Sequence, residues 1–133
     1  MTSRRALGRQ GEALAAAYLQ AQGLVIRDAN WRPTGTDLAP LLRGELDLVA
    51  MDGDTLVFVE VRSRRGAPGL AEESVTPAKC RQLLALARAY LATHDLHEEQ
   101  VPWRVDVLAL HFTPASAPSI NWLPGAVTAE SAW

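Results

Sequence analysis

One stretch decides the fold: residues 44–65, with the sequence GELDLVAMDGDTLVFVEVRSRR. Two apolar runs flank an Asp-Gly turn, and this pattern predicts a β-hairpin. Because side chains alternate between the two faces of a strand, residues two apart share a face. One face is predicted to carry the charges, with Glu45, Asp47, Val49, Phe58, Glu60 and Arg62. The other is predicted to be an apolar floor of Leu46, Leu48, Ala50, Val57, Val59 and Val61.

Two interpretations of the hairpin charges are open at this point. Acidic and basic residues on adjacent strands often form a cross-strand ion pair on a solvated face, which contributes little to stability. The alternative is a divalent-metal site, because Mg²⁺ and Mn²⁺ prefer carboxylate and carbonyl oxygens. Carboxylates that are buried or half-buried need a cationic partner, since burial disfavours their charge.

The composition is that of an ordinary globular protein, with 48% hydrophobic and 21% charged residues. The 133 residues are predicted to form one domain with its own core. A net charge of −2 gives no global reason to bind nucleic acid, so such binding would rest on local patches. No run approaches the ~18 apolar residues of a membrane span, so we expect a cytoplasmic protein without a membrane partner. Cys80, the only cysteine, excludes an intramolecular disulfide and is expected in the core.

A helix, a strand and a loop are predicted before the hairpin. Apolar residues at helical spacing indicate a helix from about Thr2 to Gln22, and Gly23 is a natural stop. Leu24 to Trp31 is predicted to be the first strand. Two prolines and a glycine predict a loop over Pro33–Arg43.

After the hairpin, a second helix, a strand and a tail are predicted. Thr76 and Pro77 are typical of the N-cap and first position of a helix. Trp103 to Phe112 alternates as a strand. Residues 113–133 are predicted to form a peripheral tail with a short strand at Ser119–Leu123, after which the end frays.

Single residues outside the hairpin also bear on chemistry. Glu12 lies among small residues at the border of the first apolar stripe, either as a solvated helix acid or as a site residue. Lys79 is the only lysine among thirteen basic residues, which suggests that a lysine is needed there. Asp106 is either a further site acid or the partner of a neighbouring arginine. His94 and His97 have no further ligand in pattern, so an exposed helix end explains them best.

The residues placed so far resemble a known pattern. Gly44–Ala50 followed by Val57–Arg62 resembles the PD-(D/E)xK nuclease signature. A wider set resembles the bacterial YraN-like family of predicted endonucleases, which is distantly similar to archaeal Holliday-junction resolvases. That set comprises Gly8–Tyr18, Asn30, Glu45–Asp47, Phe58–Arg64, Thr76–Lys79 and Arg104–Val107. The resemblance covers about residues 8 to 110 and implies a restriction-endonuclease-like α/β core, with a mixed sheet of about 4–5 strands flanked by helices.

The resemblance also implies roles for individual residues. Asp47 and Glu60 would be the metal-binding carboxylates, with the backbone carbonyl of Val61 as a further ligand. Glu12 matches the helical acid that completes the site in the resolvase-like branch.

Arg62 stands where the family usually has lysine. Arginine keeps the charge but cannot serve as a base. Three alternatives follow: Arg62 only stabilises charge in the transition state, Lys79 supplies the missing ammonium, or the protein binds DNA without cutting it. The Pro33–Arg43 loop is also longer than the connection usual in the family.

The function expected from this resemblance is hydrolysis of DNA phosphodiester bonds with Mg²⁺ or Mn²⁺. Selectivity for junctions or flaps, a role in DNA repair and a two-fold dimer follow from the resolvase likeness alone. Backbone phosphates would be held by Arg4, Arg5, Arg9, Arg64, Arg65 and Arg81. The alternatives are a non-catalytic nucleic-acid-binding module on the same fold and a structural or adaptor protein.

Overall fold

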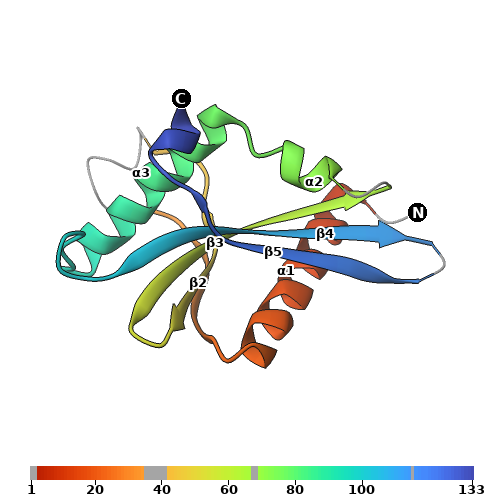
Figure 1. Cartoon of the computed structure of the whole chain (residues 1–133), viewed down its shortest axis with the longest axis horizontal. Helices are drawn as coiled ribbons and strands as arrows, with labels where there is room; N and C mark the ends of the chain where they lie inside the picture. The colour runs from red at the N-terminus through yellow and green to blue at the C-terminus, as the bar shows by residue number, and fades with distance from the viewer. Residues whose placement is uncertain (1–2, 35–41, 67–68, 115) are drawn as a thin grey trace.

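The computed structural model describes residues 3–34, 42–66, 69–114 and 116–133. A five-stranded mixed sheet with the strand order β1-β2-β3-β4-β5 forms its centre (Figure 1). The strands are β1 (Val25–Trp31), β2 (Leu46–Asp52), β3 (Thr55–Arg65), β4 (Trp103–Thr113) and β5 (Ser116–Val127). The helices are α1 (Arg4–Ala21), α2 (Leu70–Glu73), α3 (Pro77–Thr93) and the 3₁₀ helix η1 (Glu130–Ala132). The predicted α/β class and mixed sheet are confirmed.

The strand pairing explains the order of the elements. The β2–β3 hairpin is confirmed, with Asp52 opposite Thr55 and Gly53 in the left-handed region at φ +58°. β1 with β2 and β4 with β5 are also antiparallel, whereas β3 and β4 are parallel. Parallel neighbours need a crossover connection, which α2 and α3 provide.

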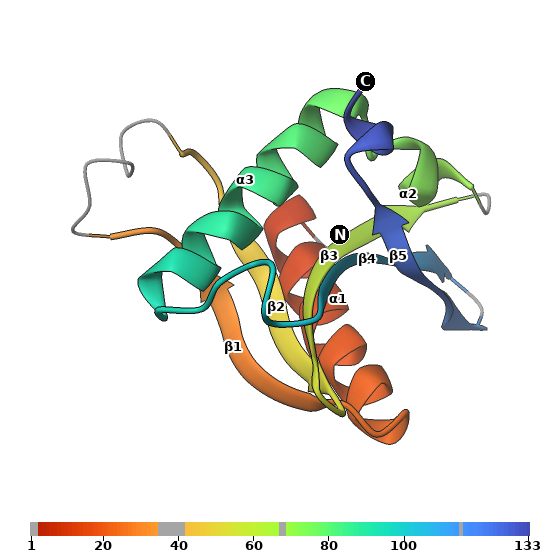
Figure 2. The ribbon, with the colours of Figure 1, turned by 60° about the vertical axis from the view of Figure 1, so that its left-hand side comes forward.

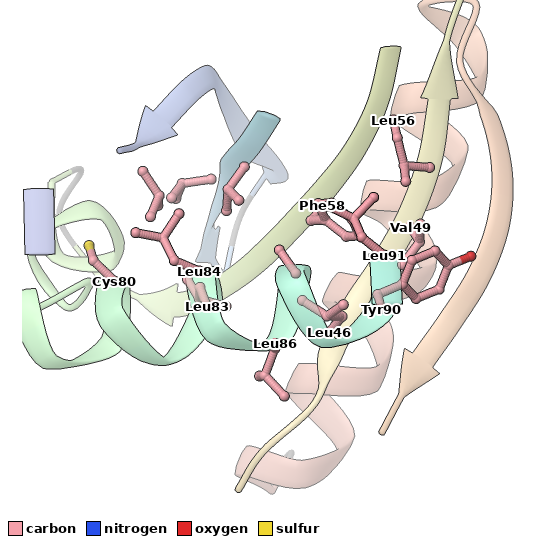
Figure 3. Close-up of a cluster of buried hydrophobic side chains, with 14 of the residues drawn as sticks. Leu46, Val49, Leu56, Phe58, Cys80, Leu83, Leu84, Leu86, Tyr90 and Leu91 are labelled. Atoms are coloured by element: carbon pink, nitrogen blue, oxygen red, sulfur yellow. The ribbon is translucent and has the colours of Figure 1, made fainter. Parts of the chain in front are cut away.

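The two long helices cover opposite faces of the sheet (Figure 2). α3 packs on one face, where Phe58, Leu83, Tyr90 and Leu91 are almost fully buried (Figure 3). α1 covers the other face through Ala15, Leu19 and their apolar neighbours on the strands. Each fully buried Leu or Phe contributes about 1.5–3 kcal/mol to stability, so the two clusters hold both helices against β3.

Capping fixes the start of both long helices. The Ser3 hydroxyl accepts the Ala6 N–H at 3.1 Å, and the Thr76 hydroxyl accepts the Lys79 N–H at 3.2 Å. Pro77 occupies the first turn of α3 as predicted. The Thr76 cap therefore fixes the backbone of Lys79 directly.

The predicted alternation of the hairpin is wrong at one residue. Leu46 packs in the α3 cluster with Val49, whereas Leu48 and Ala50 pack in the α1 cluster. The paired register of β2 with β3 begins only at Leu48. Before that position the Val61 N–H of β3 donates to the Asp47 side chain, and among the described residues Leu46 is paired only with Trp31 of β1. The regular ladder between β2 and β3 ends there, and strict alternation is lost.

The end of the chain is more ordered than predicted. Instead of a short strand and a frayed end, β5 runs for twelve residues along β4, and η1 follows it. Pro118 and Pro124 fall outside the paired positions, at the two register shifts of β5. η1 packs against α3 and places the Ala132 carbonyl 2.6 Å from the Arg81 guanidinium.

Asp106 is a structural residue on β4. Its carboxylate is fully buried and accepts hydrogen bonds from Arg104 at 3.0 Å, the Trp122 indole at 2.9 Å and the Gly125 N–H at 2.8 Å. The predicted ion pair with a neighbouring arginine is confirmed, and this network ties β5 to β4.

Within the described ranges, none of the helices has both the length and the apolar character needed to cross a membrane.

Candidate metal centre

A close approach of α1 to β3 brings Glu12 to the sheet. Gly11 is buried against the Ser63 side chain, and a Cβ at position 11 would clash with the Ser63 hydroxyl. Glycine at this position allows the close approach, because any larger residue would require the Ser63 side chain to move. Glu12, the next residue, is therefore half-buried at the rim of the sheet.

Three carboxylates meet at this rim: one from α1, one from the residue before β2 and one from β2 itself. One oxygen each of Glu12, Glu45 and Asp47 lies within 4.8 Å of the other two. The Asn30 side-chain amide, at the end of β1, donates to Glu12 at 3.0 Å and to Glu45 at 2.9 Å. Arg32 donates to the second oxygen of Glu45 at 3.1 Å. Such a group of oxygens is the donor set that Mg²⁺ and Mn²⁺ take.

Asp47 lies between Glu12 and Glu45 on one side and Glu60 of β3 on the other. Its carboxylate accepts the Val61 N–H at 2.8 Å, and a side-chain hydrogen bond joins it to Glu60. Burial, followed by the contact with Glu60, raises the pKa of Asp47 to about 9, while the Val61 N–H lowers it. We call Glu12, Glu45, Asp47 and Glu60 the carboxylate cluster.

Glu60 is the most buried member of the carboxylate cluster, with 3% of its side chain exposed. Its Oε2 lies 3.4 Å from the Lys79 ammonium and 3.5 Å from the Arg62 guanidinium. These are ion pairs, because Oε2 accepts no hydrogen bond from any residue that the structure describes. A buried carboxylate oxygen without a hydrogen-bond donor is an available ligand.

Hydrogen bonds to the C-cap residue of α2 fix the Arg62 side chain. Its Nε donates to the Ser74 hydroxyl at 2.9 Å and its Nη2 to the Ser74 carbonyl at 3.4 Å. The Ser74 hydroxyl in turn donates to the Ala71 carbonyl. The guanidinium is thus fixed beside Glu60 by two hydrogen bonds that it donates to Ser74, whose hydroxyl is itself held by Ala71.

A pocket of about 540 Å³ opens over this region. Its lining comprises Leu7, Gly8, Glu12, Asp47, Glu60, Val61, Arg62, Ser63, Arg64, Arg65 and Lys79. The six residues expected to bind metal or act in catalysis therefore lie together, although they come from three elements and from the first turn of α3. The Val61 N–H donates a hydrogen bond to Asp47. The role of the Val61 carbonyl as a metal ligand stays a prediction.

The predicted phosphate-binding arginines are more scattered. Arg64 and Arg65 line the pocket, whereas Arg5 and Arg9 are exposed on α1 and lie outside the pocket lining. Arg81 lies outside the pocket lining and donates to the Ala132 carbonyl. Arg4 begins α1, but its side chain lies outside the described residues, as do residues 35–41 of the predicted loop.

Sequence reasoning missed three contributors to this centre. Glu45 was placed on the charged face but given no site role, and Asn30 and Ser74 were given none. Asn30 has φ +53°, a left-handed conformation that asparagine tolerates better than most residues. The available signal was that Asn30 and Glu45 both belong to the residues that carry the family resemblance, but nothing in the sequence gave the distance of Asn30 from Glu12.

Comparisons with known proteins identify relatives but no activity. The sequence model described as "Uncharacterised protein family UPF0102" matches residues 11–110. A UPF0102 protein of Roseiflexus castenholzii is 45% identical over 130 residues, covering 96% of this chain and 98% of the relative. A UPF0102 protein of Beutenbergia cavernae is 43% identical, covering 94% and 98%. A UPF0102 protein of Pseudomonas syringae is 41% identical, covering 94% and 95%.

Proposed function

The chain belongs to the uncharacterised protein family UPF0102, and from the geometry of its candidate metal centre we propose that it is a metal-dependent endonuclease acting on DNA. The observation that carries the proposal is Glu60: a buried carboxylate oxygen without a hydrogen-bond donor, beside the Asp47 carboxyl and two cationic side chains. The Lys79 and Arg62 ion pairs neutralise this oxygen without donating a hydrogen bond to it. Its lone pairs therefore remain available to a metal ion.

The donor set fits Mg²⁺ or Mn²⁺. Asp47 and Glu60 would hold the ion, with Glu12 on the facing helix and the Val61 carbonyl completing the shell. When bound, the ion polarises the phosphate and lowers the pKa of an attacking water. Oxygen ligands without cysteine or histidine favour these hard ions over zinc.

Lys79 and Arg62 would have different roles as the two cations of this centre. Lys79 is 25% exposed at the start of α3, so its ammonium can reach a phosphate entering the pocket. Arg62 is fixed by Ser74 and cannot take or give up a proton in proteins. We infer that Lys79 supplies the ammonium that the family usually carries at position 62, and that Arg62 neutralises developing charge.

The remaining cations would bring DNA to an acidic centre. Arg64 and Arg65 line the same pocket, and Arg5 and Arg9 extend the basic rim along α1. Such contacts go to backbone phosphates and carry no sequence information. The net charge of −2 makes this local rim, together with the bound ion, the source of attraction.

Cleavage assays with full-length protein test the proposal. End-labelled four-way junction, flap, single-stranded and duplex DNA would be incubated with Mg²⁺ or Mn²⁺. We expect metal-dependent cutting that falls by at least about 100-fold in Asp47→Asn and Glu60→Gln, because each replaces an anionic carboxylate ligand with a neutral amide. Lys79→Ala should lose about 100-fold and Lys79→Arg should regain part of it if charge is what matters.

Asp54→Asn is the matched control, since Asp54 is an exposed carboxylate in the hairpin turn, outside the pocket lining. Cutting that survives both Asp47→Asn and Glu60→Gln would refute the proposed centre. Metal-dependent DNA binding without cutting on any substrate would favour the non-catalytic binding module, the alternative that Arg62 in place of lysine supports.

A further inference from the structure

We propose that Asn30 is a positioning residue of the carboxylate cluster: its amide holds Glu12 and Glu45 at the spacing in which Glu45 joins Glu12 and Asp47, two ligands of the proposed centre, in binding a divalent cation. The inference rests on the proposed function, because it needs a metal at this centre. It gives roles to Asn30 and Glu45, which belong to the residues that carry the family resemblance but to which that resemblance assigned no role.

The Asn30 amide lies between two of the carboxylates. Asn30 Nδ2 lies 3.0 Å from a Glu12 oxygen and 2.9 Å from a Glu45 oxygen, so its two N–H groups serve two different carboxylates. Glu12 comes from α1 and Glu45 from the residue before β2, while Asn30 lies near the end of β1. One side chain therefore joins three separate segments at the cluster.

Electrostatic repulsion acts among the carboxylates of the cluster. Three carboxylate oxygens within 4.8 Å of one another repel when ionised, and half-burial strengthens this repulsion. The side chains would move apart unless donors hold them. Asn30 supplies donors to two of the three, and Arg32 supplies one to the outer oxygen of Glu45 at 3.1 Å.

The hydrogen bonds from Asn30 leave both carboxylates able to bind an ion. Each carboxylate offers about four lone-pair sites, and the amide uses one on each. Glu12 and Glu45 thus keep free lone pairs while their orientation is fixed. Outer partners that orient ligating carboxylates in this way typically change metal affinity by about 10–100-fold when removed.

The backbone explains why the residue is asparagine. At φ +53° most side chains are strained, whereas asparagine and glycine adopt this conformation readily. Glycine at position 30 is therefore the variant that removes the amide while keeping the backbone. Alanine would confound the loss of the amide with strain.

The test is Mn²⁺ binding to full-length protein by isothermal titration calorimetry, with folding checked by urea unfolding. Asn30→Gly should stay folded and bind Mn²⁺ about 10–100-fold more weakly than wild type. The matched control is Asn121→Ala, which also removes an amide donor to a carboxylate, at 3.2 Å from Glu72 and outside the pocket lining. It should bind Mn²⁺ as wild type does.

A double-mutant cycle tests whether Asn30 acts through its carboxylates. Once Glu45→Ala has removed one partner, Asn30→Gly should cost less affinity than it costs in the wild-type background. Equal losses in both backgrounds, or wild-type affinity in a folded Asn30→Gly, would overturn the inference. Asp47→Asn separates it from the proposed function: if that variant keeps Mn²⁺ binding, the centre itself is wrong, whereas if only Asn30→Gly keeps it, the positioning role is wrong.

Discussion

At the scale of single residues, the Asp47 carboxyl should give metal affinity and the stability of the metal-free protein opposite dependences on pH. Burial and the neighbouring Glu60 raise its pKa to about 9 from an ordinary value of 3.8. The protonated form is therefore favoured at neutral pH in the absence of metal. A cation that binds Asp47 must displace this proton, so metal affinity should rise with pH.

Stability without metal should show the opposite pH dependence. Because the folded-state pKa of Asp47 lies above its unfolded value, the protonated carboxyl stabilises the folded state fully below about pH 4 and progressively less as pH rises toward 9. Urea unfolding in EDTA should therefore give a free energy of unfolding that falls over this range. Asp47→Asn should flatten the slope and Asp54→Asn should not. An unchanged slope in Asp47→Asn would contradict the assignment.

Two carboxylates outside the cluster should differ sharply in their effect on stability. Asp106→Ala leaves Arg104, the Trp122 indole and the Gly125 N–H without their buried acceptor, and should lower the free energy of unfolding by about 3–5 kcal/mol. Glu98→Ala removes an ion pair with Arg88 in which both side chains are about half exposed, and should change it by less than about 1 kcal/mol. Chemical denaturation of both variants checks the contrast, which similar losses would contradict.

At the scale of elements, the distance between α1 and β3 depends on one glycine. Gly11→Ala places a methyl group into the Ser63 side chain and should destabilise the protein by about 1–3 kcal/mol while moving Glu12. Gly8→Ala lies on the same helix with open space around its Cβ, and should stabilise by about 0.5–1 kcal/mol. Thermal unfolding of the pair measures the difference, and equal effects would show that the close approach does not matter.

Elements with strong local signals were predictable and the others were not. The Asp-Gly turn gave the hairpin, and Thr76 with Pro77 gave the start of α3, because each signal is complete within a few residues. β5 was predicted too short because Pro118 and Pro124 interrupt its pattern, and its pairing with β4 depends on distant contacts such as Trp122 with Asp106. Leu46 was misplaced because alternation across the hairpin assumes that β2 and β3 stay paired, whereas at Leu46 β2 is paired, among the described strands, with β1 alone.

At the scale of the whole molecule, the site was predictable only in part. Asp47, Glu60 and Glu12 followed from the resemblance, and the pocket brings them together with Lys79. The contacts of Asn30, Arg32 and Ser74 connect segments far apart in the chain, so no spacing rule reveals them. For the same reason Arg81, which the sequence grouped with the phosphate-binding arginines, lies outside the pocket lining.

The local basic rim should govern how DNA binding depends on salt. In an Asp47→Asn background that prevents cutting, Arg65→Ala should weaken binding and reduce the slope of log K against log salt by about 1. Arg88→Ala, which removes an arginine paired with Glu98 and outside the pocket lining, should leave the slope unchanged. Fluorescence anisotropy across a salt series measures both. Equal slopes for the two variants would place the DNA elsewhere.

The two edge strands of the sheet, β1 and β5, are irregular, and this affects how two copies of the protein could associate. β5 carries Pro118 and Pro124 at its register shifts, and β1 at the other edge has a shift between Ile26 and Asp28. Proline lacks an N–H, and a bulged edge bends away from an incoming strand. Neither edge offers a long regular row of donors, which guards the fold against edge-to-edge aggregation. Two copies that met as a dimer would do so through side chains, not by extending the sheet.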